Sequence, residues 1–256
     1  MVFSDLHLPG RLLAEKKKTV ETVNSWKDVD GVVALGDIVE SQGTREEYSA
    51  AKEYLSRLEK PVYPVAGNHE YMYDKDPVTG KTRRASTAVK AEKLRLFQET
   101  FSLPSLRYEK RLGPYLLLFI SADELDSKHL ASISSGTLEW MQEALGRSPQ
   151  APTIVFFHAP LKGTLGGRGA VAEHASFFAQ PHKKLRKVVR QNPQIFLWVS
   201  GHTHVAPANP RFRHPVIVYE GQVTDIHNCD MDGRSSFNDK SRKTTTKSTT
   251  ARAERG

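Results

Sequence analysis

The sequence predicts an α/β fold, and two observations lead to this class. Short apolar runs alternate with amphipathic stretches along most of the 256 residues, a pattern that is typical of layered α/β proteins. A chain of this length can bury a large core without disulfide bonds, and it contains one cysteine. We therefore expect layers of sheet and helix that need no disulfide framework.

Seven apolar runs are expected to form the strands. Each is short, as strands usually are, and most are rich in β-branched or aromatic residues. The runs are Val2–Ser4, Gly31–Leu35, Val62–Ala66, Tyr115–Ala122, Thr153–Phe157, Ile195–Val199 and Val216–Tyr219. Met1 stands four residues before Asp5, so the first strand should be shorter than the usual length of about 5–6 residues.

Five stretches carry apolar residues at helical spacing and are expected to form helices. They are marked by Leu12, Leu13, Val20, Val23 and Trp26; by Tyr48, Ala51, Leu55 and Leu58; by Leu94, Phe97 and Phe101; by Leu138, Met141 and Leu145; and by Leu185, Val188 and Val189. Thr44 and Glu47 precede the second stretch at the spacing of a capping box, which predicts that this helix begins there.

Residues 1–224 are expected to form one domain, and residues 225–256 a polar, basic tail without a fold. The tail is dominated by Ser, Thr, Lys and Arg, a composition that buries too little apolar surface to order a chain. Within the domain, Tyr71–Ala88 is polar and basic, and Leu161–Gln180 contains four glycines. We expect two long loops there, and loops of such length are usually functional or disordered.

Charge and hydropathy limit the partners of the chain. The formal net charge of +8 favours anionic ligands in general, without identifying one. The longest apolar runs, Tyr115–Ile120 and Ile195–Val199, are far shorter than the roughly 18 residues of a membrane span. The first residues lack the basic and apolar regions of a signal peptide. We therefore expect no membrane partner and a cytoplasmic location.

Polar residues follow five of the predicted strands directly. The blocks are Asp5-Leu6-His7, Gly36-Asp37, Gly67-Asn68-His69-Glu70, His158 and Gly201-His202-Thr203-His204. In open α/β sheets the carboxyl ends of the strands form the edge at which ligands bind. Asp, Asn and His form a mixed oxygen and nitrogen ligand set that suits manganese, iron or zinc. The five blocks therefore predict a metal site at this edge.

The spacing within the blocks supports one shared site. Residues i and i+2 point the same way in an extended segment, so Asp5 with His7, and His202 with His204, can each direct two ligands to one place. A glycine precedes Asp37, Asn68 and His202. We expect these glycines to let the backbone turn sharply away from the sheet.

In these five blocks the sequence resembles the calcineurin-like metallophosphoesterases. The signature of that family runs Asp-x-His, Gly-Asp-x-x-(Asp/Glu), Gly-Asn-His-(Asp/Glu), a lone His and Gly-His-x-His. All five parts occur here in order, the second as Gly36-Asp37-Ile38-Val39-Glu40, and the resemblance covers about residues 1–224. It implies a four-layer α/β/β/α sandwich with a two-metal site.

The resemblance also implies a role for each residue. Asp5, His7, Asp37 and His204 would hold the first metal, and Asp37, Asn68, His158 and His202 the second. Asp37 would bridge the two ions, and His69 would stand near the leaving-group oxygen as a proton donor or electrostatic stabiliser. A metal-bridged hydroxide would attack the phosphorus of a phosphoester in line, as in general two-metal chemistry. Glu40 and Glu70 are expected to support the ligands.

Four functions remain open at this stage. A phosphodiesterase is favoured, because Val62–His69 and the later blocks look like the small bacterial cyclic-nucleotide and glycerophosphodiester branch. A phosphomonoesterase acting on phosphoproteins or nucleotides would use the same core. A nuclease-type member is possible but not favoured, since no additional DNA-binding domain is identifiable. A catalytically silent metal-binding scaffold is disfavoured, because every ligand and His69 are present. The sequence does not indicate an oligomeric state.

Basic side chains in the two predicted long loops are candidate substrate contacts. Arg83 and Arg84 lie in the first loop, and Lys162 and Arg168 in the second. We expect both loops to border the site, where such cations could contact the part of an anionic substrate that is not transferred.

Overall fold

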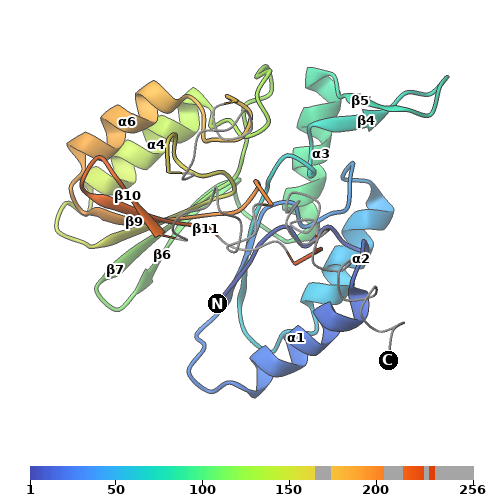
Figure 1. Cartoon of the computed structure of the whole chain (residues 1–256), viewed down its shortest axis with the longest axis horizontal. Helices are drawn as coiled ribbons and strands as arrows, with labels where there is room; N and C mark the ends of the chain where they lie inside the picture. Colours follow the sequence, from blue (N-terminus) through green and yellow to red (C-terminus); the bar gives the residue numbers. More distant parts are fainter. Residues whose placement is uncertain (165–173, 205–215, 228–230, 234–256) are drawn as a thin grey trace, which may run out of the picture.

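The computed structural model describes residues 1–164, 174–204, 216–227 and 231–233. The predicted α/β class is confirmed: the described residues form two sheets, a separate hairpin and five helices (Figure 1). The three-stranded sheet has the order β1 (Val2–Phe3), β2 (Val32–Leu35), β3 (Val62–Val65) and is parallel throughout. As expected, its first strand is short.

The six-stranded sheet has the order β10-β11-β9-β8-β7-β6. Its strands are β6 (Arg107–Leu112), β7 (Tyr115–Ile120), β8 (Thr153–Phe157), β9 (Ile195–Ser200), β10 (Val216–Tyr219) and β11 (Val223–His227). The four central strands are parallel, and the edge strands β6 and β10 are antiparallel to their neighbours. Parallel strands end at the same side, so this sheet presents its carboxyl ends along one edge.

All five predicted helices are present: α1 (Leu13–Ser25), α2 (Arg45–Leu55), α3 (Thr87–Thr100), α4 (Ser135–Gly146) and α6 (His182–Gln191). The predicted capping box begins α2, where the Thr44 hydroxyl accepts from the Glu47 amide and the Glu47 carboxylate accepts from the Thr44 amide. Helices α1, α2 and α3 lie on the side of the three-stranded sheet, and α4 and α6 on the side of the six-stranded sheet (Figure 1). Among the described residues, no helix combines the length and apolar character needed to cross a membrane.

Alternate residues along the strands face different layers, as the pleat requires. In β2, Val32 and Ala34 belong to the main core that the helices cover, whereas Val33 and Leu35 face the other sheet. The two sheets meet through a second cluster, which consists of Val33, Leu35, Val65, Phe119, Phe156 and Val199. The layers therefore follow the order helices, sheet, sheet, helices.

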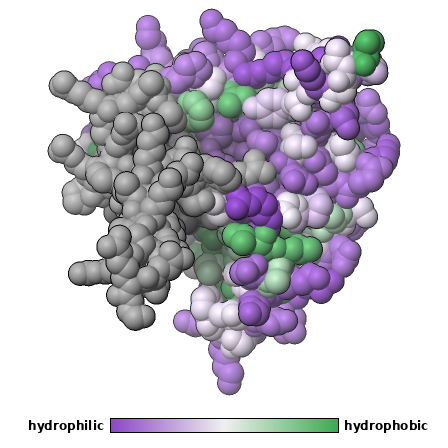
Figure 2. Space-filling view, turned by 45° about the vertical axis from the view of Figure 1, so that its right-hand side comes forward, coloured by the Kyte–Doolittle hydropathy of each residue, from purple (hydrophilic) through white to green (hydrophobic). Residues whose placement is uncertain are grey.

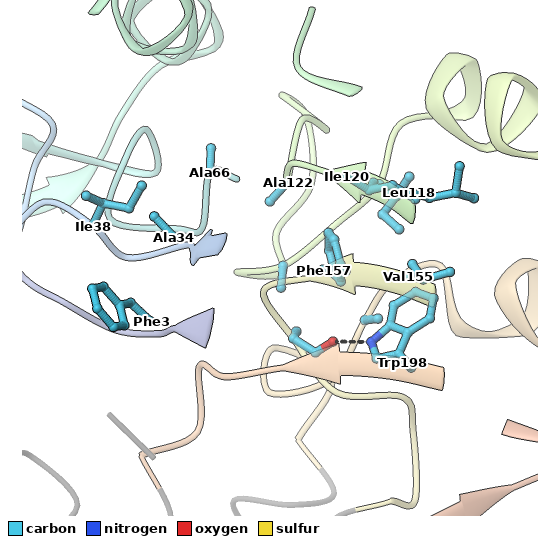
Figure 3. Packing of buried hydrophobic residues seen from close by; sticks show 14 of the residues in the cluster. Phe3, Ala34, Ile38, Ala66, Leu118, Ile120, Ala122, Val155, Phe157 and Trp198 are labelled. Atoms are coloured by element: carbon cyan, nitrogen blue, oxygen red, sulfur yellow. Dashed lines mark hydrogen bonds between the residues drawn. The ribbon is translucent and has the colours of Figure 1, made fainter. Parts of the chain in front are cut away.

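Phe119 of β7 stands at the centre of this contact between sheets. Its ring stacks on Tyr63, Tyr108 and Phe156, with centroids 5.1, 4.8 and 5.0 Å away. Such aromatic pairs contribute about 0.5–1.5 kcal/mol each beyond their buried area. At the ligand-bearing edge, the Ala122 amide donates to the Ala66 carbonyl at 2.9 Å, and Figure 3 shows these two residues together where β3 and β7 end.

One of the two expected loops differs from the structure. Tyr71–Ala88 contains a hairpin, β4 (Tyr73–Lys75) and β5 (Thr82–Arg84), followed by the start of α3. Its turn is closed by Asp76, whose carboxylate accepts from the Thr79 amide at 2.8 Å. Both faces of these strands carry charged residues, so the sequence has no apolar alternation from which the strands could be predicted. Of Leu161–Gln180, residues 165–173 lie outside the described residues; the remainder forms turns in which Thr164 and Ser176 are buried.

The ordered structure continues past residue 224, where the sequence predicts the end of the domain. Strand β11 continues to His227, and Asp225 in its centre is fully buried. Further along, Asp232 is buried against Lys16 of α1 with 2.7 Å between carboxylate and ammonium, and it also accepts from the Arg11 amide. A buried charge is tolerated when it is paired and hydrogen-bonded. Polar composition therefore did not mark the end of the fold, and residues 234–256 lie outside the described part.

The face shown in Figure 2 is largely hydrophilic, with small groups of apolar residues between the polar ones. Most apolar side chains are inside, among them Trp198, whose indole nitrogen donates to the Ala159 carbonyl at 3.0 Å (Figure 3).

Candidate metal centre

The five predicted blocks converge at the carboxyl ends of β1, β2, β3, β8 and β9. Their backbones are tied to one another across the two sheets. The Gly201 amide donates to the His158 carbonyl at 2.8 Å, and the His202 amide donates to the Asp5 carboxylate at 3.0 Å. The His69 amide donates to Asp37 at 2.9 Å. Ligands that are far apart in sequence are thus held by hydrogen bonds of their own backbone.

Four side chains form a first ligand group: Asp5, His7, Asp37 and His204 each offer an atom within 4.8 Å of the others. His204 Nε2 lies 3.2 Å from Asp5 Oδ1 and 3.3 Å from His7 Nε2. Two imidazole nitrogens that face each other at this distance need a proton or a cation between them. This group is the one that the resemblance assigns to the first metal.

A second ligand group shares Asp37 and adds His158 and His202, again within 4.8 Å. His158 Nε2 lies 3.2 Å from Asp37 Oδ2. Asn68 Oδ1 and His202 Nδ1 are buried and lack a hydrogen-bond partner among the described residues. Buried polar atoms are rarely left without a partner, so these two atoms fit ligands that await a cation.

Three histidine rings are oriented by backbone carbonyls on the side away from the centre. His7 Nδ1 lies 3.2 Å from the Glu40 carbonyl and His158 Nδ1 lies 2.9 Å from that of Leu35. His202 Nε2 lies 2.8 Å from the carbonyl of Ser176. A ring nitrogen that faces a carbonyl carries the proton, which leaves the other nitrogen with its lone pair toward the metal position. Glu40 thus supports a ligand through its backbone.

Of the three glycines that precede Asp37, Asn68 and His202, two are required by close packing against a ligand and not by a sharp turn of the backbone. A Cβ on Gly67 would lie 2.5 Å from Asp37 Oδ1, and one on Gly201 would lie 2.4 Å from Asp5 Oδ2. Neither of these glycines has a positive φ. Only Gly36, with φ of +74°, meets the expectation of a sharp turn, and a Cβ there would also strike the ring of His158.

Strained backbone is concentrated in the ligands themselves. Positive φ angles occur at Asp5 (53°), His7 (45°), Asp37 (49°), His202 (74°) and His204 (50°). Asp and His tolerate this left-handed region better than most residues, yet such conformations still cost about 1–3 kcal/mol each and cluster at functional sites. These five conformations therefore lower the stability of the fold, and they direct the five side chains toward the centre.

Electrostatics keep both carboxylates of the centre ionised. Burial alone would raise the pKa of Asp5 and Asp37, but nearby imidazoles outweigh it: the hydrogen bond from His204 acts first on Asp5, and the charge of His158 first on Asp37. The pKa of both groups therefore lies below its usual value. Burial, followed by the charge of His158, lowers the pKa of His202 to about 4, so this ring is neutral. Burial acts to lower the pKa of His158, but the charge of Asp37 outweighs it and raises this pKa to about 9. Ionised carboxylates and neutral imidazole are the forms that bind metals, so a cation at this position would replace the proton of His158.

Glu70 supports the centre without facing it. Its carboxylate is fully buried and accepts from four backbone amides: those of Asp37, Ile38, Val39 and Gly67, at 3.0, 2.7, 3.1 and 2.6 Å. Burial, followed by the charge of Asp37, raises its pKa to about 7. Glu70 thereby fixes the turn that carries Asp37 to the turn that carries Asn68, as the sequence led us to expect.

His69 lies at the open side of the centre. Its side chain is 19% exposed, and its Nε2 is 3.8 Å from Asp37 Oδ2. The ring stands edge-on to His7, with centroids 4.7 Å apart, and 5.3 Å from the ring of Tyr73. It is therefore beside the ligands and accessible to a bound molecule.

The predicted substrate contacts do not share one environment. Arg83 is 3.1 Å from Asp76 and 3.9 Å from Asp74, so its charge is compensated within the hairpin. Arg84 donates to the Lys128 carbonyl at 3.2 Å. Lys162 is exposed and lies 5.5 Å from the centroid of the Phe178 ring. Arg168 lies outside the described residues.

A second buried polar cluster, the Asp225 network, lies beside the centre, and the sequence did not predict it. Asp225 accepts from the Leu161 amide at 2.8 Å and from the hydroxyls of Thr164 and Ser200 at 2.7 and 3.0 Å. His227 Nδ1 lies 3.1 Å from Ser200 Oγ. The sequence signal for this strand was its period of two, which places Val223, Asp225 and His227 on one face. Because two of these three residues are polar, the face does not have the apolar pattern of a buried strand.

The match to known proteins agrees with this geometry. A sequence model described as calcineurin-like phosphoesterase matches residues 1–206. The chain belongs to the calcineurin-like phosphoesterase family. The chain is 23% identical over 177 residues to a 3′,5′-cyclic-nucleotide phosphodiesterase of Nostoc sp., and the match covers 69% of this chain and 56% of that protein. It is 27% identical over 210 residues to a glycerophosphodiester phosphodiesterase of Enterobacter lignolyticus, covering 81% and 68%.

Solved structures agree on the fold of the chain. A dimetal phosphatase from Danio rerio superposes with a TM-score of 0.61 at 15% identity, covering 90% of this chain and 86% of that one. The purple acid phosphatase of yellow lupin has a TM-score of 0.55 at 15% identity, covering 91% and 43%. At this identity the likeness concerns the fold alone.

Proposed function

We propose that this chain is a two-metal phosphoester hydrolase that acts on phosphodiesters. The observation that carries the proposal is the pair of ligand groups that share the Asp37 carboxylate, one completed by Asp5, His7 and His204 and the other by His158 and His202. Asn68 supplies a further oxygen to the second group. The donor set suits manganese, iron or zinc.

Each group of the chain then has a task. When bound, two divalent ions supply positive charge that clamps the phosphoryl oxygens and acidifies a water. Asp37 holds the two positions together, because its carboxylate belongs to both ligand groups. His69 would protonate the leaving-group oxygen, a role supported by its partly exposed side chain and by the hydrogen bond from its amide to Asp37.

Phosphodiesters are favoured over monoesters because the two curated relatives are named as phosphodiesterases. The chain spans 56% of the length of the first and 68% of the second, so its substrate is proposed and not transferred from them. A phosphomonoesterase would use the same ligands, and a nuclease-type activity would be favoured by the net charge of +8. The cytoplasmic location stays a prediction.

The test is hydrolysis of a bis-aryl phosphodiester and an aryl phosphomonoester by manganese-loaded protein. We expect metal-dependent turnover with the diester preferred. In Asp37→Ala, kcat/KM should fall by about a thousandfold, since losing the bridging carboxylate removes several kcal/mol of charge stabilisation. Asp28→Ala, at an exposed site, is the matched control. A folded protein that binds two metals and turns over neither ester would contradict the proposal.

A further inference from the structure

The base of the β4–β5 hairpin adjoins the metal centre. Tyr73 and Arg84 are directly opposite each other in the two strands, so their side chains project from the same face of the hairpin. That face is turned toward the centre, because the Tyr73 ring lies 5.3 Å from the ring of His69. Arg84 is therefore separated from the catalytic histidine by a single aromatic ring.

The two neighbouring arginines of β5 point in opposite directions. Arg83 pairs with Asp74 in the ladder and forms ion pairs with Asp74 and Asp76. Arg84 is exposed, and within the part of the chain that the structure describes it forms no ion pair with a carboxylate. One guanidinium donor bonds the Lys128 carbonyl, which orients the group and leaves further donors of its fork for a ligand.

The loop that carries Lys128 adds positive charge to the same place. His129 follows it, and its pKa is lowered first by burial and then by the charges of Lys128, His174 and Arg84. The charges of these groups thus reach one imidazole, and Arg84 is joined to this loop by its bond to the Lys128 carbonyl. The loop is anchored on both sides, by Lys90 Nζ on the Leu125 carbonyl at 2.6 Å and by the Ile133 amide on the Gln180 carbonyl at 2.8 Å.

Acidic groups of this loop are engaged elsewhere. Asp123 accepts from the hydroxyls of Ser134 and Thr137 at 2.7 and 2.6 Å. Asp126 accepts from the hydroxyl of Thr87 at 2.9 Å, and Glu124 from the Asp126 amide at 3.2 Å. They lower the net charge of the loop, but their oxygens do not occupy the Arg84 guanidinium.

We propose that Arg84, whose guanidinium is oriented by the Lys128 carbonyl, binds a second anionic group of the substrate, separate from the phosphoester at the metal centre. The planar guanidinium matches a phosphate or a carboxylate with two parallel hydrogen bonds. The Tyr73 ring would pack against the part of the substrate that links the two anionic groups. This inference rests on the proposed function, because the metal centre must receive the first phosphoryl group.

The test measures binding, so that it does not depend on turnover. Alkanediol bisphosphates of increasing chain length are titrated into manganese-loaded protein by calorimetry, each against the alkyl monophosphate of the same length. We expect one chain length at which the bisphosphate binds about tenfold more tightly, as one charge-assisted hydrogen-bonded contact at an exposed site provides. Two equivalent phosphates alone give a statistical factor of about two.

Two arginine variants decide the assignment. Arg84→Ala should lose the bisphosphate advantage and keep the affinity for monophosphates, whereas Arg83→Ala, the neighbour on the opposite face, should keep both. An advantage that survives in Arg84→Ala, or that never exceeds the statistical factor in wild type, overturns the subsite. Failure of the hydrolase proposal appears separately, as absent turnover of the simple diester.

Discussion

The metal centre and the Asp225 network are both buried clusters of aspartate and histidine near the ends of β9 and β11, and they differ in how their polar atoms are satisfied. In the Asp225 network, three donors reach one carboxylate and His227 bonds Ser200. In the metal centre, Asn68 Oδ1 and His202 Nδ1 find no partner among the described residues. Five ligands of the centre also have positive φ angles.

The difference shows what separates a site from a structural network. A buried polar atom without a partner costs about 1–3 kcal/mol, and a strained ligand costs a similar amount. In a purely structural cluster we expect neither cost, and in the Asp225 network the carboxylate has three hydrogen-bond donors. The metal centre retains them because its atoms are arranged for a bound cation and not for each other.

The largest expected effect comes from one histidine of each cluster. His158→Ala should reduce the metal content below two ions per chain and lower kcat/KM by about a thousandfold, since a ligand of the proposed pair is lost. His227→Ala should keep both ions and most of the activity, with a loss of about 1–3 kcal/mol in stability. Metal analysis, kinetics and urea unfolding measure this. An equal loss of metal in both variants would contradict the assignment of metal binding to the metal centre alone.

A smaller effect should distinguish the clusters by pH. Burial raises the pKa of Asp225 to about 7, above its unfolded value of about 3.9. The native state therefore binds this proton more tightly, and the resulting stability is present below about pH 4 and lost as pH rises through about 7. The stability advantage of wild type over Asp225→Asn should thus shrink by on the order of a few kcal/mol across this window.

Urea unfolding at several pH values measures this difference. His227, whose pKa is lowered to about 4 by burial, acts in the opposite direction, but it is present in both proteins and cancels in the difference. Asp28→Asn, at an exposed site, should show no such trend. A pH-independent difference for Asp225→Asn would mean that the network holds an ionised carboxylate.

The smallest effect is expected at Glu70, which combines features of both clusters. Its carboxylate contacts the turns of the metal centre, but four amides satisfy it. In Glu70→Gln, either orientation of the amide sets an NH₂ group against two backbone N–H donors. We expect a loss of about 1–3 kcal/mol in stability and a loss of about 10–100-fold in metal affinity, measured by unfolding and manganese calorimetry. Glu59→Gln, at an exposed site, is the control, and unchanged metal affinity would restrict Glu70 to a structural role.

Local patterns carried much of the fold and of the metal centre. The alternation of apolar runs predicted the three parallel strands with Asp5, Asp37 and Asn68 at their ends, and the Thr44–Glu47 spacing predicted the start of α2. These features depend on neighbours within about four positions along the chain, so they can be predicted without a structure. The residue types of the ligands and their positions directly after strands likewise predict the chemistry of the site.

Only the tertiary structure decided which distant polar groups meet. Lys16 and Asp232 are 216 residues apart, and no local pattern joins them, so the sequence predicts a tail after residue 224. The opposite directions of Arg83 and Arg84 follow from the pairing of β4 with β5. The sequence did not predict this pairing, because both strands carry charged residues instead of an apolar pattern. Burial of Asp225 is stable because its three donors come from two segments that are distant in the chain, the turn 161–164 and the end of β9. Satisfaction of a buried polar group is a property of the assembled fold, and for that reason the chain order alone does not reveal it.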